Sequence, residues 1–352
     1  MTDSIRIKQT AQNQTMDCIK LVAALWVVII HIPFPGNAGG LIGCMGRFSV
    51  PVFFAISGYF SYQTKSGKIL KRIGGILKLE ALGIAVQVLC SLFLHLYNDV
   101  PLRIFYGDMK LTAEKLAQWL VLNIDPYGGH LWYLSAMAAS YGMLWVYVRF
   151  FGEEQVNYKP LYLLSVALLG THFALDEFAL GLGVVLPYQL TRNALLFGLP
   201  MLSLGLFLRE YGERIWKNFG LTRGKLILLI LTGAALCVIE WSGIGYCEIY
   251  VGSTLMTAAL LLFAAAYPTV WARPGWISSC LSRFGSLAMW IYLLHMALYD
   301  LYQKTVQQPL DLLTGGKEDW LRPILLAAAS LLGAIVCERV QHLLKSFRKK
   351  TK

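Results

Sequence analysis

The sequence contains few charged residues: they make up 14% of its 352 residues, whereas 57% are hydrophobic. A soluble protein carries about 25% charged residues. This shortage excludes an ordinary soluble globular protein and predicts that lipid is the solvent for much of the chain.

Paired cysteines are also lacking. None of the seven cysteines forms a C-x-x-C pair, and Cys90, Cys237 and Cys337 lie inside apolar runs. The pattern predicts neither a disulfide framework nor a zinc site, and we expect no metal.

A basic soluble domain is missing as well, although the formal net charge is +11. Nucleic-acid binding would require that charge to be concentrated on such a domain, so we expect no nucleic-acid partner. A basic membrane face explains the charge better. About twenty mostly polar residues precede the first apolar run, which argues against a cleaved signal peptide.

What the sequence does contain is a series of apolar segments that are long enough to cross a hydrocarbon core of about 30 Å. We predict an all-α polytopic membrane protein of about ten transmembrane helices. A cytoplasmic arm (1–18) precedes a single membrane domain (19–338), and a basic cytoplasmic tail (339–352) follows it. The predicted spans are 19–33, 48–62, 79–97, 131–148, 160–175, 193–208, 226–240, 249–267, 285–303 and 322–338.

The distribution of basic residues predicts the orientation. If the N-terminus is cytoplasmic, the inner segments, counted with Lys20, hold 23 of the 31 Lys and Arg residues. The positive-inside rule therefore favours both termini inside. The longest loop, 98–130, then faces outward, and its stretch LTAEKLAQWL predicts a surface helix with Thr112 as N-cap.

The first span, DCIKLVAALWVVIIH, carries Lys20 and His31. Eleven residues of α-helix bring two side chains to within about 20° of each other around the axis, roughly 16 Å apart along it. An ionisable group in a membrane helix is a functional candidate. The structural alternatives are a snorkelling lysine and an interfacial histidine.

Other spans carry polar or helix-breaking residues. Pro51, Ser57 and Gly58 predict a helix that is broken or packed closely beside a cavity. Placement at a membrane boundary explains Trp132 as well as substrate contact does, and a hydrogen-bonded packing role is the alternative for His295. The further candidates for acceptor binding or for orienting His31 are His130, Trp132, Arg192, Asn193, Tyr292 and His295.

The order of these motifs resembles the acyltransferase-3 family of integral membrane acyltransferases. The resemblance rests on D-x-x-K-x10-H, then FFAISGYF, then HLWYL, then S-x5-Y-x-x-H, and it covers essentially the whole chain. Two departures stand out: Lys20 occupies a position that is usually arginine, and Arg72 is followed by Gly75 where the family carries a second arginine.

The resemblance implies transfer of an acyl group from cytoplasmic acyl-CoA to a hydroxyl outside the cell. Acetyl-CoA is the default donor, and a cell-surface glycan is a fitting acceptor at a bacterial-type inner or plasma membrane. Lys20, Lys71 and Arg72 would bind the CoA phosphates, and His31 would act as general base. A covalent acyl-histidine is the alternative mechanism.

Two other functions remain open from the sequence. Broken helices with intramembrane histidine or arginine are also typical of transporters. The membrane portion of vancomycin-resistance serine racemases resembles the same family, so the fold alone does not separate transport from transfer. A non-catalytic membrane assembly or sensing protein is the second alternative.

Overall fold

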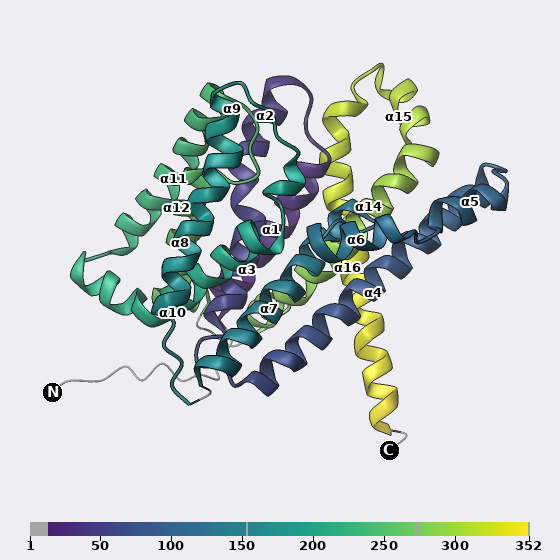
Figure 1. Ribbon diagram of the computed structural model, residues 1–352. Coiled ribbons are helices and arrows are strands. Elements are labelled where there is room, and N and C mark those ends of the chain that lie inside the picture. The colour runs from purple at the N-terminus through teal and green to yellow at the C-terminus, as the bar shows by residue number, and fades with distance from the viewer. Residues whose placement is uncertain (1–12, 153, 272, 274, 351–352) are drawn as a thin grey trace.

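The computed structural model describes residues 13–152, 154–271, 273 and 275–350, and it is a bundle of helices (Figure 1). This described part contains no strand, which confirms the all-α prediction. Most of the predicted N-terminal arm (1–12) and the last two tail residues (351–352) lie outside the described residues.

The first half of the described chain forms α1 (Gln14–His31), α2 (Gly36–Met45), η1 (Gly46–Phe48), α3 (Ser49–Tyr59), α4 (Ser66–Tyr97), α5 (Leu102–Met109), α6 (Ala113–Leu122), η2 (Gly129–Leu131) and α7 (Trp132–Phe151). The second half forms α8 (Lys159–Phe173), η3 (Ala174–Phe178), α9 (Ala179–Gly181), η4 (Tyr188–Leu190), η5 (Ala194–Gly198), α10 (Leu199–Asn218), α11 (Arg223–Ile244), α12 (Val251–Ala266), α13 (Trp276–Leu281), α14 (Phe284–Thr305), α15 (Gln307–Thr314) and α16 (Glu318–Lys350). Of these, η3 and η5 are π-helices.

Each of the ten predicted spans falls on a helical segment. Within the described residues, eight helical segments are long and apolar enough to cross a membrane. The two other predicted spans fall on α7 and on α12, which has 16 residues. The protein therefore spans a membrane several times, and the count of ten stays a prediction.

Several helices extend beyond the apolar segments. The first helix begins at Gln14, inside the predicted arm, and Asn13 caps it by accepting a hydrogen bond from the Met16 amide at 2.9 Å. The fourth begins at Ser66, and α16 continues through the basic tail to Lys350. Lysine, arginine and glutamate are good helix formers, so a helix does not stop where its apolar face ends.

Three of the segments predicted to face outward lie at the same end of the bundle. Figure 1 places α2, α9 and α15 at that end, whereas α16 finishes at the opposite end. Thr112 caps α6 by accepting from the Lys115 amide at 3.2 Å, which confirms the helix predicted in the longest loop. Which end faces the cytoplasm stays a prediction.

Helices α3 and α10 pack with almost no space between their backbones. A methyl group added at Gly58 would lie 1.8 Å from the Leu202 carbonyl oxygen, and one added at Gly205 would lie 1.8 Å from the Ala55 carbonyl oxygen. Small residues at such crossings let membrane helices approach closely. The close packing expected at Gly58 is therefore present, but Gly58 does not line the cavity described below.

Candidate functional site

A cavity of about 150 Å³ opens beside the last residue of α1, His31. It lies where α1, η1, the start of α7 and the loops before η5 and α12 meet. Its wall combines apolar side chains with an imidazole, two guanidinium groups and a carboxylate. The lining residues are Val27, Ile30, His31, Gly46, Arg47, Val50, Trp132, Arg192, Phe197, Tyr246 and Glu248.

The local sequence HIPFPG fixes His31 as the end of its helix. Pro33 and Pro35 follow within four residues. A proline cannot continue a helix, and it disfavours helical backbone at the residue before it. The backbone therefore turns away directly after His31, which leaves the imidazole at the cavity.

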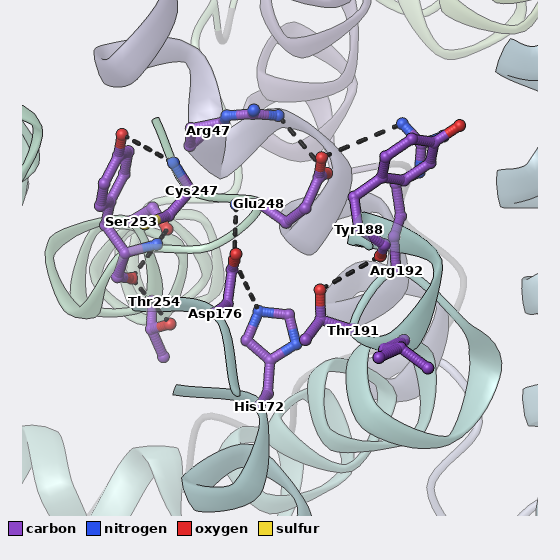
Figure 2. Close-up of polar contacts among 12 residues, drawn as sticks. Arg47, His172, Asp176, Tyr188, Thr191, Arg192, Cys247, Glu248, Ser253 and Thr254 are labelled. Carbon is purple, nitrogen blue, oxygen red and sulfur yellow. Dashed lines mark hydrogen bonds and ion pairs between the residues drawn. The ribbon is translucent and has the colours of Figure 1, made fainter. Parts of the chain in front are cut away.

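The charged wall of the cavity consists of Arg47, Arg192 and Glu248 (Figure 2). Arg47 Nη1 lies 3.6 Å from one Glu248 carboxylate oxygen, and Arg192 Nη1 lies 4.0 Å from the other. The Arg47 guanidinium stacks on the Tyr246 ring at 3.8 Å, and that of Arg192 stacks on the Tyr188 ring at 4.0 Å. The aromatic rings hold both cations in place.

Glu248 is held from behind by α8 and the π-helix η3. Its backbone amide donates a 2.7 Å hydrogen bond to Asp176 Oδ2, and the same oxygen lies 3.6 Å from Nε2 of the buried His172 (Figure 2). π-Helices often occur at functional sites. The arrangement fixes the loop that carries Glu248 against the cavity.

Three histidines from distant parts of the sequence lie close together: His31, His130 and His295. His31 lines the cavity, and the other two lie beside it outside the cavity lining. The ring centroids of His31 and His295 lie 5.3 Å apart, and those of His130 and His295 lie 5.0 Å apart. His295 Nδ1 lies 2.8 Å from the Tyr292 carbonyl oxygen. Because a carbonyl only accepts, Nδ1 carries the proton and Nε2 carries a lone pair.

His130 is positioned by the turn that precedes it. Asp125 Oδ1 accepts hydrogen bonds from the amides of Tyr127 at 2.8 Å and Gly128 at 3.0 Å. The Tyr292 hydroxyl donates a hydrogen bond to the His130 carbonyl oxygen at 2.6 Å. Burial raises the pKa of Asp125 to about 6. Burial, and secondly the neighbouring His295, lowers the pKa of His130 well below its usual range, so His130 stays neutral at physiological pH.

The predicted CoA-binding residues do not line this cavity. Lys20 Nζ pairs with Asp17 at 3.0 Å, about three turns of α1 away from His31. Arg72 donates to the Ser61 hydroxyl and, at 2.9 Å, to the Phe60 carbonyl, and Lys71 is exposed. The lining on α1 begins at Val27, so Lys20 lies outside it.

The further candidates divide into three groups. Trp132 and Arg192 line the cavity with His31. His130, Tyr292 and His295 form the neighbouring histidine cluster. Asn193 instead caps η5, accepting hydrogen bonds from the amides of Leu195 and Leu196 at 2.9 and 3.0 Å.

The sequence analysis did not single out Arg47, Tyr246 or Glu248. One signal was available: Arg47 and Arg192 are both among the eight basic residues that the charge count leaves on the outer side. A cation on the side where cations are sparse is a functional candidate. No comparable signal marks Glu248, because its position depends on tertiary contacts to Asp176 and the two arginines.

These features define an all-helical, multi-pass membrane protein with an imidazole in a polar cavity. A family model described as an acyltransferase domain matches residues 13–339. The chain therefore belongs to this family of acyltransferases, which confirms the resemblance and favours acyl transfer over transport. Neither the search of curated proteins nor the search of solved structures gave a match.

Proposed function

We propose that this acyltransferase moves an acyl group, acetyl by default, from cytoplasmic acyl-CoA to a hydroxyl of an extracytoplasmic acceptor such as a cell-surface glycan. His31 is the general base. The observation that carries the proposal is the position of His31: it ends a membrane helix at a cavity whose wall also holds Arg47, Arg192 and Glu248.

The proposed reaction balances without any further reactant. The neutral imidazole of His31 takes the proton of the acceptor hydroxyl. At the same time the hydroxyl oxygen of the acceptor attacks the thioester carbonyl carbon. A C–O bond forms, the C–S bond breaks, and the imidazolium returns the proton to the departing CoA thiolate. The Arg192 guanidinium, which also lines the cavity, would stabilise the negative charge that develops on the carbonyl oxygen.

The direct test is an assay with isotopically labelled acetyl-CoA and fractionated envelope glycans. The purified protein in nanodiscs should transfer the label to a glycan fraction, detected as a mass shift. Uptake of a solute into sealed vesicles without any labelled acceptor would contradict the proposal.

His295 acts in this proposal as a positioning residue for His31. The His295 ring is completely buried and packs against the His31 ring. Its Nδ1–H group donates a hydrogen bond to the Tyr292 carbonyl oxygen. We expect His295→Ala to lower kcat by about 10–100-fold, because a misplacement of about 1 Å can cost 10²-fold in rate. The KM for acyl-CoA should stay unchanged.

The matched variant is His295→Asn, whose amide nitrogen can replace Nδ1 as donor to the Tyr292 carbonyl but lacks the ring. Steady-state kinetics should place it close to His295→Ala. Wild-type kcat in His295→Asn would reduce the residue to a backbone anchor.

Lys20 is proposed to bind a CoA phosphate at the other end of α1. We expect Lys20→Ala to raise the KM for acyl-CoA by about 10–100-fold, the size of a lost charge-assisted hydrogen bond. The kcat at saturating donor should change little, because a remote phosphate is bound equally in the ground and transition states. Lys20→Arg, which retains the charge, is the control; an equal loss of kcat in Lys20→Ala would contradict the role.

Gly285 on α14 offers an independent test of the same position. A methyl group added there would lie 2.7 Å from Asp17 Oδ1 and 3.7 Å from Lys20 Nζ. Gly285→Ala must displace this ion pair, so we expect a several-fold higher KM for acyl-CoA at nearly constant kcat. Unchanged donor kinetics would separate the Asp17–Lys20 pair from donor binding.

A further inference from the structure

The Arg47 guanidinium keeps one complete hydrogen-bonding edge unused. Its side chain is 9% exposed, and both Nε and Nη2 are buried without a hydrogen-bond partner among the described residues. These two nitrogens form the planar fork with which arginine binds a carboxylate through two parallel hydrogen bonds. A buried donor without a partner destabilises a protein unless a ligand satisfies it.

Glu248 does not use this edge. Its carboxylate lies 3.6 Å from Arg47 Nη1 and 4.0 Å from Arg192 Nη1, and both separations are longer than a good hydrogen bond. The Tyr246 ring packs on the Arg47 guanidinium with its centroid 3.8 Å from Cζ, and it takes no hydrogen bond from Nε or Nη2. Glu248 therefore offsets charge without occupying the Arg47 fork.

The charges of the cavity wall sum to one positive charge. Arg47 and Arg192 are always protonated, Glu248 is the single acid among the lining residues, and the remaining lining groups are neutral when His31 acts as a base. A buried charge without a counterion is costly. The excess matches a carboxylate, which has one negative charge, better than a phosphate monoester, which carries about two at neutral pH.

We propose that the cavity recognises an acceptor that carries a carboxylate near its reacting hydroxyl, as in a uronic acid or another sugar acid. The Arg47 fork binds the carboxylate, and Arg192 adds to the field. A volume of about 150 Å³ equals that of roughly five water molecules, which is enough for a carboxylate and the atoms next to it. This inference rests on the proposed function, since it names the acceptor class of the same site.

The test measures binding without any acyl donor, so it does not depend on catalysis. The probes are galacturonate and galactose, which differ at C6, and their dissociation constants follow from ligand-detected saturation-transfer NMR on the full chain in nanodiscs at matched ionic strength. We expect galacturonate to bind the wild type about 10–100-fold more tightly, the range for a charge-assisted bidentate contact. Equal affinities would overturn the proposal without any variant.

Two variants of the cavity wall should change galacturonate affinity in opposite directions. Arg47→Gln removes the fork, so the preference over galactose should fall below about threefold, and Arg47→Lys should recover only part of it. Glu248→Gln removes the competing negative charge, so galacturonate should bind several-fold more tightly. Weakening by Glu248→Gln, or no change in Arg47→Gln, would overturn the assignment.

Arg209→Gln is the matched control, because this arginine also stacks on a tyrosine, Tyr59, but does not line the cavity. Arg209→Gln should retain the wild-type preference for galacturonate over galactose. Loss of that preference in Arg209→Gln would overturn the proposal. Galactose 6-phosphate tests the competing anion, and tighter binding of this probe than of galacturonate would overturn the choice of a carboxylate.

His31→Ala separates this inference from the proposed function. It should retain the galacturonate preference even though it stops transfer. If His31 proves dispensable for transfer while the preference persists, the proposed base fails and the acceptor class stands.

Discussion

Replacing His31 with alanine should lower the rate of acyl transfer by about 10²–10⁴-fold, the usual contribution of a positioned general base. This loss of rate is the largest that we expect from replacing a single polar side chain. His31 lines the cavity at the end of the first helix, and its imidazole has the lone pair that a general base needs. The KM for acyl-CoA should change little, since the proposed phosphate contacts lie about three turns away. Initial rates with labelled acetyl-CoA give both values.

The control for this variant is His342→Ala, which removes an exposed histidine near the end of α16. It should transfer at the wild-type rate. His31→Ala should elute as the same monodisperse species as wild type, because its side chain lines a cavity and is only partly buried. Residual activity above about half of wild type would remove His31 from the mechanism.

The same residue also separates the two chemical routes. An acyl-histidine intermediate would accumulate when the protein is mixed with acetyl-CoA without acceptor, and intact-mass spectrometry after rapid quenching would detect it on His31. General-base catalysis requires all three components together and leaves the protein unmodified.

Gly205→Ala is the substitution with the largest expected effect on folding. Its new methyl group would lie 1.8 Å from the Ala55 carbonyl oxygen and 2.6 Å from the Tyr59 backbone nitrogen. Backbone atoms cannot move aside as a side-chain tip can, so α3 and α10 must separate. We expect a loss of at least about 1–3 kcal/mol, the usual range for overpacking, measured as a lower thermal midpoint in detergent.

Gly142→Ala on α7 is its matched control, because a methyl group there would meet no atom within 4 Å. In a helix interior this change stabilises by roughly 0.5–1 kcal/mol, so the two alanines should shift the midpoint in opposite directions. A wild-type midpoint for Gly205→Ala would mean that the helices are not in backbone contact.

The sequence predicted the helices well because apolar length is a local property. Every predicted span falls on a helical segment, and the Thr112 cap and the close contact at Gly58 could also be inferred from neighbouring residues. Helix ends were predicted less well, since Gln14, Ser66 and Lys350 extend helices into polar sequence.

The site could be predicted only in part. His31, His130 and His295 were each selected from their own segments, but their meeting depends on how α1, η2 and α14 pack together. Asn193 was chosen as a polar residue at a boundary, and its side chain caps a helix. Arg47 and Glu248 were not predicted as site residues because they lie about two hundred residues apart in the sequence, and only the fold brings them together.

The tightly packed middle of α1 limits how the acyl donor can reach the cavity. Between Lys20 and the cavity, Ala23, Ala24 and Val28 are completely inaccessible to solvent. Water has no access to this face of the helix between the two ends. A thioester arm that followed it from Lys20 to His31 would therefore have to push the packed helices apart.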